Sequence, residues 1–156
     1  MAVESTHPSQ AEAEQVAELL GRQPQTTFQI VVRDKMGAPL VLRNAALQHD
    51  GRPMPTMYWL IGKDALRRVS RLESIGGVRT VERLVPAEQI AAAHARYAVE
   101  RDATIPAQHS GPRPSGGVAG TRQGIKCLHA HYAYHLAGGD DPVGRWVAAQ
   151  LLETPE

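Results

Sequence analysis

The fold is decided by three short apolar segments, namely TTFQIVVR at residues 26–33, PLVLR at 39–43 and TMYWLI at 56–61. Each segment is rich in β-branched, aliphatic or aromatic residues, and turn-forming residues separate it from the next, as is typical of β-strands. Three strands joined by short connections predict a small antiparallel meander. Because such a sheet cannot bury its own faces, we expect helices to cover it.

Helical patterns lie on both sides of the three predicted strands. Before them, the apolar spacing predicts a helix over residues 11–20 that ends at Gly21. After them we expect four helices, at about residues 63–75 (ended by Gly76 and Gly77), 86–102, 125–137 and from Pro142 onward. The expected fold class is therefore α+β, with a three-stranded antiparallel sheet covered by four to five helices. We expect a single domain over residues 11–152, preceded by a flexible acidic tail at 1–10.

The composition excludes several classes of protein. The chain has 156 residues, a formal net charge of +1 and one cysteine, Cys127. A nearly neutral charge with only 4% aromatic residues gives no reason to expect nucleic acid as a partner. A lone cysteine cannot form an intrachain disulfide, and no apolar run approaches the roughly 20 residues of a membrane span. We therefore expect a cytoplasmic protein without a membrane span.

A long segment before the penultimate helix is the strongest local signal. Residues 103–126 are rich in glycine and proline, and their charged residues are all basic. Backbone N–H groups of successive glycines, together with the unpaired N–H groups of a helix start, can hold an anion. We therefore predict a small-anion site at this Gly/Pro-rich basic loop (about 103–124) and the helix after it, formed by Gly116, Gly117, Gly120, Arg122, Lys126 and His129. The glycine spacing is not that of a nucleotide-hydrolysing P-loop, and a flexible connector with solubilising charges is the alternative.

A cysteine and three histidines, Cys127, His129, His131 and His135, follow within nine residues. Residues four apart on a helix share a face, so His131 with either His135 or Cys127 could clamp a metal ion. A structural zinc site needs four ligands, and the sequence offers no second cluster. We therefore expect no metal and no other cofactor; if a metal binds, its candidate ligands are Cys127, His131 and His135. A catalytic role for Cys127 or His129, as nucleophile or base, is a further alternative.

Several separated motifs, in the same order, resemble family 501 of the domains of unknown function, a set of small actinobacterial proteins. The motifs are LGR at 20–22, DGRPMPTMYWL at 50–60, RLESIG at 71–76, GG at 116–117, KCLH at 126–129 and DPVG at 141–144. The resemblance implies a cytosolic bacterial protein encoded near a septum-formation initiator and an exopolyphosphatase, which suggests cell division or phosphate metabolism. It also implies a zinc site in relatives that combines Cys127 and His129 with cysteines at the positions of Asp34, Met36 and Gly62. This chain lacks those cysteines, so we expect packing to hold the same place together.

The preferred function is a non-enzymatic accessory factor that binds a small anion or an acidic protein partner. The partner could belong to the division machinery, with the arginine-bearing helix at 65–75 as the docking surface. The alternative is an enzyme that acts on a phosphorylated or acyl substrate with Cys127 and His129.

Overall fold

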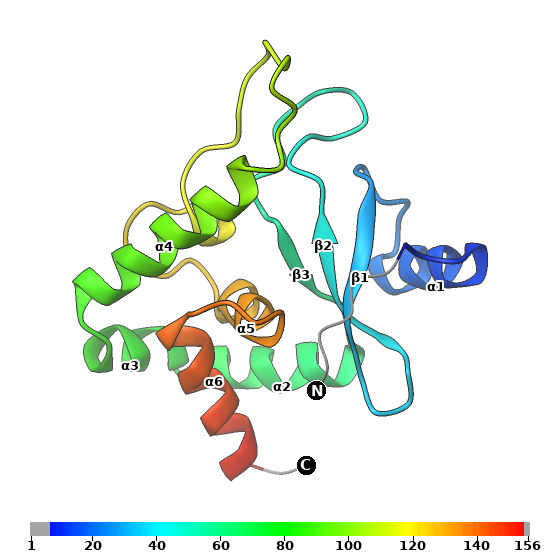
Figure 1. The fold of residues 1–156 in the computed structure, drawn as a ribbon. Coiled ribbons are helices and arrows are strands. Elements are labelled where there is room, and N and C mark those ends of the chain that lie inside the picture. Colours follow the sequence, from blue (N-terminus) through cyan, green and yellow to red (C-terminus); the bar gives the residue numbers. More distant parts are fainter. Residues whose placement is uncertain (1–6, 155–156) are drawn as a thin grey trace.

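Three antiparallel strands form the sheet in the order β1–β2–β3, as the sequence predicts (Figure 1). They are β1 (Phe28–Arg33), β2 (Pro39–Asn44) and β3 (Tyr58–Leu60) in a computed structural model that describes residues 7–154. Leu42 of the central strand pairs with Ile30 of β1 and with Trp59 of β3. The register of β1 shifts between Ile30 and Val32, so that Val31 and Val32 are both buried in the same cluster.

Within residues 7–154, six α-helices cover the sheet, where four to five were predicted. They are α1 (Gln10–Leu20), α2 (Lys63–Ser74), α3 (Gly77–Leu84), α4 (Ala87–Asp102), α5 (Leu128–Leu136) and α6 (Pro142–Glu153), with a short 3₁₀ helix, η1, at Val118–Gly120. The additional helix is α3, where the sequence led us to expect only the end of α2. Gly76 does end α2, with a φ of +90°, but the chain resumes a helix at Gly77. Val81 of α3 is fully buried, so packing holds this short helix in place.

The two faces of the sheet have different covers. Val16 of α1 packs with Ile30, Leu42 and Ile61 on one face. The opposite face, which includes Val41 and side chains of β3, packs with α2 to α6 in the larger core, and Figure 1 shows these helices gathered on the side of the sheet away from α1. Residues 41 and 42 point to opposite faces because side chains alternate along a strand. The strands are thus buried on both sides, which explains their nearly continuous apolar sequence.

The described chain begins just before α1. Ser9 caps this helix, because its Oγ accepts from the N–H of Glu12 while Glu12 accepts from the N–H of Ser9. The predicted flexible tail at 1–10 falls largely on residues 1–6, which lie outside the described residues. Gly21 ends the helix with a φ of +74°, as expected. Among the helices of residues 7–154, none combines the length and the apolar character that a bilayer crossing requires.

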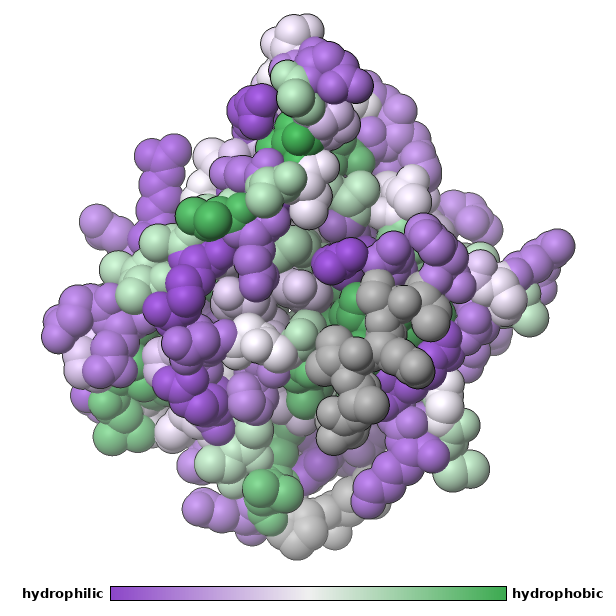
Figure 2. Space-filling model, viewed as in Figure 1, coloured by the Kyte–Doolittle hydropathy of each residue, from purple (hydrophilic) through white to green (hydrophobic). Residues whose placement is uncertain are grey.

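The segment 103–127, which joins α4 to α5, is fixed to the rest of the molecule near its middle. Arg101 is 1% exposed, and its guanidinium donates to the carbonyl oxygens of Pro55 and Gly116 at 3.1 and 3.0 Å. Val118, two residues later, is fully buried in the core. On the face shown in Figure 2, hydrophobic residues lie in separate small patches among hydrophilic ones. Because Arg101 binds the carbonyl of Gly116 and Val118 is buried, the predicted loop is packed against the domain at Gly116–Val118.

Candidate functional site

The penultimate helix, α5, begins at Leu128, three residues later than the predicted start at about Ile125. Gly124 has a φ of +67° and Cys127 is extended, so the chain becomes helical only after Cys127. Lys126 therefore lies before the helix and is exposed. The N–H of Leu128 donates to Oε2 of Glu73 at 2.7 Å. At the helix start, where we expected an external anion, one N–H group thus binds a carboxylate of the protein itself.

Glu73 reaches this place from the last turn of α2, where it also meets His129. Its Oε1 lies 3.3 Å from Nδ1 of His129. The other ring nitrogen, Nε2, lies 3.1 Å from Oγ of Ser70, three residues before Glu73 and on the same side of α2. Both nitrogens of the ring therefore have partners on α2, which fixes the ring's orientation. The side chains of His129 and Glu73 are 24% and 26% exposed, so solutes can reach them.

Cys127 completes a group of three potential metal ligands. Its Sγ, a ring nitrogen of His129 and a carboxylate oxygen of Glu73 all lie within 4.8 Å of one another. Burial raises the pKa of the Cys127 thiol, and the negative charge of Glu73 raises it further, although the backbone N–H of Ala130 opposes them. Without a metal the thiol therefore stays protonated at neutral pH. Thiolate, imidazole and carboxylate are the three ligand types of protein-bound zinc, and we name this group the Glu73–Cys127–His129 cluster.

The three glycines of the predicted anion site make contacts within their own loop. The N–H of Gly117 donates to the carbonyl of Thr121, and the N–H of Gly120 donates to the carbonyl of Gly117. Gly116 and Gly120 both have positive φ values, +74° and +73°, and a Cβ on Gly117 would lie 2.5 Å from the Cα of His94. These glycines therefore build a tight turn and a close contact with α4. The N–H groups of Gly117 and Gly120 are already used, and His129 lies in the cluster with Glu73.

The two basic residues of the predicted anion site are exposed. Within residues 7–154, neither Arg122 nor Lys126 forms an ion pair with a carboxylate. A cavity of about 500 Å³ does lie beside this loop, but its lining includes none of the six predicted residues. The residues that line it are Glu82, Ala87, Glu88, Ile90, Ala91, Gln123 and Gly124. The cavity beside the loop is therefore lined by residues other than the two basic residues Arg122 and Lys126.

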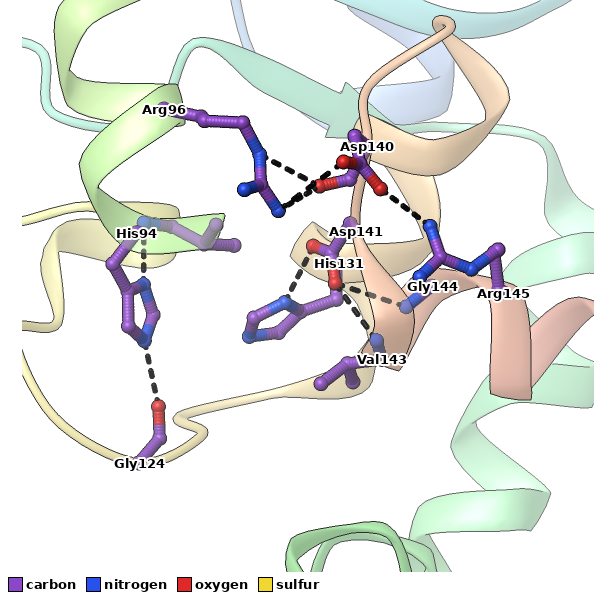
Figure 3. A network of polar contacts seen from close by, with 10 residues as sticks. His94, Arg96, Gly124, His131, Asp140, Asp141, Val143, Gly144 and Arg145 are labelled. Atoms are coloured by element: carbon purple, nitrogen blue, oxygen red, sulfur yellow. Dashed lines mark hydrogen bonds and ion pairs between the residues drawn. The ribbon is translucent and has the colours of Figure 1, made fainter. Parts of the chain in front are cut away.

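The conditional metal-ligand set of Cys127, His131 and His135 stays a prediction, although in the described chain Cys127 clusters with Glu73 and His129. His131 is buried inside the fold, where its Nδ1 lies 2.7 Å from Oδ2 of Asp141 (Figure 3). His135 lies one turn further along α5, and burial, with a contribution from the charge of Arg145, lowers its pKa. His129 and His131 are two residues apart on α5, so their side chains leave the helix on nearly opposite sides. The ring of His129 contacts α2, and the ring of His131 lies in the core.

The sequence did not identify Glu73 and Ser70 as site residues. They lie on α2, more than 50 residues before Cys127, and spacing along the chain does not reveal which helices pack together. The sequence shows only that Ser70 and Glu73 are three residues apart, which places them on one side of a helix. Asp141 caps α6, because its Oδ1 accepts from the N–H groups of Val143 and Gly144. Its second contact, with His131, had no signal in the sequence.

The fold and the cluster together define an α+β protein with a mixed thiol, imidazole and carboxylate group at a helix start. The chain belongs to the family described as Protein of unknown function (DUF501), whose model matches residues 30–149. The matched region contains most of β1, the strands β2 and β3, the helices α2 to α5, most of α6 and all three residues of the cluster. None of the curated proteins matches this chain, and none of the solved structures does.

Proposed function

We propose that the protein binds one metal ion of the zinc class through Glu73, Cys127 and His129. The observation that carries this proposal is the approach of one sulfur, one nitrogen and one oxygen ligand to within 4.8 Å of one another. Zinc bonds of about 2.0–2.3 Å in a tetrahedral arrangement need ligand atoms about 3–4 Å apart, so small side-chain rotations suffice. A donor set that contains a thiolate and an imidazole favours zinc over magnesium or calcium, which prefer oxygen.

The outer contacts of the cluster support the same interpretation. Carboxylates and histidines that bind metals are usually held by hydrogen bonds on the atoms that face away from the ion. Glu73 is held in this way by the N–H of Leu128 on Oε2, and His129 by Ser70 on Nε2. Oε1 of Glu73 and Nδ1 of His129 are then the atoms that would face the ion. Because both side chains are already oriented, little conformational entropy is lost when the ion binds.

Three protein ligands leave a fourth tetrahedral position for water or for an anion from outside. Lys126 precedes Cys127, is exposed, and forms no ion pair within residues 7–154, so it adds positive charge beside that position. This proposal therefore keeps the small-anion binding predicted from the sequence. The metal ion, rather than the glycine N–H groups, would bind the anion. The protein would act as a non-enzymatic accessory factor that binds a small anion or an acidic group of a partner protein. A reducing cytoplasm would keep Cys127 free to bind the ion; a role in cell division or phosphate metabolism stays a prediction.

The second candidate is an enzyme for acyl or phosphorylated substrates. It is favoured by the alignment of Ser70, His129 and Glu73, in which the imidazole lies between a hydroxyl and a carboxylate as in serine hydrolases. Two observations count against it. Burial raises the pKa of Cys127, which disfavours a thiolate nucleophile, and the nearest helix-start donor, the N–H of Leu128, is bound to Glu73 instead of being free to stabilise an oxyanion.

Calorimetric titration of the full-length, reduced protein with zinc sulfate tests the first candidate. We expect one ion per chain, and the variants Cys127→Ser and Glu73→Gln should bind it at least about tenfold more weakly. His49→Asn is the matched control, because His49 is an exposed histidine that lines a different cavity, beside α1. Zinc binding that is unchanged in Cys127→Ser would refute the proposal. If Ser70→Ala abolishes an esterase activity that zinc removal leaves intact, the second candidate is correct instead.

A further inference from the structure

His131 is a buried histidine whose orientation is set by one carboxylate. Its side chain is 1% exposed, and Asp141 is fully buried. Oδ1 of Asp141 accepts from the N–H groups of Val143 and Gly144 at 2.9 and 3.2 Å, which leaves Oδ2 to accept from Nδ1 of His131 at 2.7 Å. This pattern assigns the ring proton to Nδ1. In the neutral ring Nε2 then carries a lone pair and accepts a hydrogen bond.

Nε2 of His131 is the unpaired buried atom of the described chain. Within residues 7–154, it is the one buried side-chain nitrogen or oxygen without a hydrogen-bond partner. Leaving such an atom unpaired is costly, and a bound molecule is a common explanation. In Figure 3 the free side of the His131 ring is turned toward His94 and the chain segment that contains Gly124. The ring centroids of His94 and His131 are 5.6 Å apart.

The segment of residues 122–126, here named the cover segment, makes a single hydrogen bond within the described chain, and its Ile125 packs against the larger core. That bond joins Nε2 of His94 to the carbonyl of Gly124 at 2.7 Å, while Nδ1 of His94 accepts from the N–H of Val118 at 3.0 Å. Gly120, just before the cover segment, and Gly124, within it, both have positive φ values. Few hydrogen bonds and flexible glycines are typical of a segment that opens locally while the rest of the domain stays folded.

A cavity of about 500 Å³ lies beside the cover segment, and Gln123 and Gly124 form part of its wall. Its remaining lining combines apolar side chains of α4, such as Ile90, with the carboxylates of Glu82 and Glu88. Both carboxylates are exposed and form no ion pair within residues 7–154. This charge repels anions and attracts cations, while the apolar wall suits an aliphatic group.

We infer that the cover segment closes a second binding site, in which Nε2 of His131 accepts a hydrogen bond from a small aliphatic amine or amino alcohol. Breaking the bond between His94 and Gly124 lets the cover segment move away, which joins the cavity to the unpaired nitrogen. The ligand's amino or hydroxyl hydrogen then pairs with Nε2, and Glu82 and Glu88 balance its positive charge. Asp141 is a positioning residue, since it keeps the acceptor nitrogen turned toward the cover segment. The site shares no residue with the Glu73–Cys127–His129 cluster.

Diethyl pyrocarbonate, which acylates an accessible unprotonated imidazole nitrogen, tests whether the cover segment opens. In the wild-type chain at pH 7.5, mass spectrometry should find His131 modified far more slowly than the exposed His49. In His94→Ala the modification of His131 should be about tenfold faster, since lost ring hydrogen bonds shift an opening equilibrium by about that factor. His109→Ala is the matched control, because His109 bonds a carbonyl, that of Pro112, in the same loop. In His109→Ala, His131 should be modified as slowly as in the wild type.

An unchanged rate of His131 modification in folded His94→Ala would overturn the inference. A titration of the wild-type protein with ethanolamine tests the ligand independently, and it decides the question if His94→Ala does not fold. Two-bond ¹H–¹⁵N spectra follow the Nε2 resonance of His131, and acetate serves as the anionic control. The inference predicts a saturable shift of this resonance with ethanolamine and none with acetate. If ethanolamine causes no shift, or if acetate causes the same shift, the proposed site is wrong.

Discussion

The replacement Asp141→Ala removes three hydrogen bonds from a fully buried place. The carboxylate caps α6 through the N–H groups of Val143 and Gly144, and loss of such a cap costs about 0.5–2 kcal/mol. The same replacement leaves Nδ1 of His131 without its acceptor in a place that water does not reach, which costs about 1–3 kcal/mol. Because these losses share one residue and need not add fully, we expect a total of about 2–4 kcal/mol. For a domain of this length, that lowers the Tm by about 5–15 °C.

Urea denaturation followed by circular dichroism measures this loss, with Asp140→Ala as the control. Asp140 is the preceding residue and bears the same charge, but its side chain is 65% exposed and pairs with Arg145 and Arg96 at the surface (Figure 3). Exposed ion pairs contribute little to stability, so the control should unfold close to the wild-type urea concentration. If Asp141→Ala is no less stable than Asp140→Ala, the buried contact between Asp141 and His131 does not exist as described, and the reasoning about His131 is refuted.

Three further predictions concern the attachment of the loop before α5. Arg101→Met leaves the partly buried carbonyls of Pro55 and Gly116 without their donor, so we expect a loss of about 2–4 kcal/mol in urea denaturation; a loss below 1 kcal/mol would contradict this role. Gly117→Ala places a Cβ 2.5 Å from the Cα of His94, which should cost about 1–3 kcal/mol or more, and unchanged stability would show that the contact is loose. Burial lowers the pKa of His94 below its ordinary value of 6.5. The contribution of the neutral, buried His94 to stability is therefore complete above pH 6.5 and is lost as the pH falls below that value. The Tm should therefore fall less steeply between pH 6.5 and 5 in His94→Gln than in the wild type, and equal slopes would contradict the prediction.

Much of the fold could be predicted from the sequence because the strands and helix ends carry local signals. The three strands are apolar segments between turn residues, and the end of α1 at Gly21 and the start of α6 at Pro142 follow from backbone preferences. α3 was missed for a physical reason. Gly76 and Gly77 indicate the end of a helix, but only the first of them is in the left-handed conformation, and burial of Val81 then holds the next turn in helical form.

The candidate site was only partly predictable. The sequence singled out the start of α5, where the structure brings Cys127 and His129 close together, and it predicted an external anion there. Glu73 supplies a carboxylate from α2, and a contact between helices so distant in the chain leaves no trace in residue spacing. The start of α5 was also placed too early, because nothing in the composition shows that Gly124 takes a positive φ. Lys126 consequently lies outside the helix, where its charge faces solvent.

Cobalt(II) titration of the reduced protein, followed by absorption spectroscopy, tests the central claim that Glu73, Cys127 and His129 hold a metal ion. Cobalt replaces zinc with the same ligands, and its spectrum reports a bound thiolate and the coordination geometry directly. The cluster predicts a saturable thiolate-to-cobalt charge-transfer band at one ion per chain, which Cys127→Ser abolishes and excess zinc displaces. A spectrum identical to that of free cobalt, or a band that survives in Cys127→Ser, would contradict the claim.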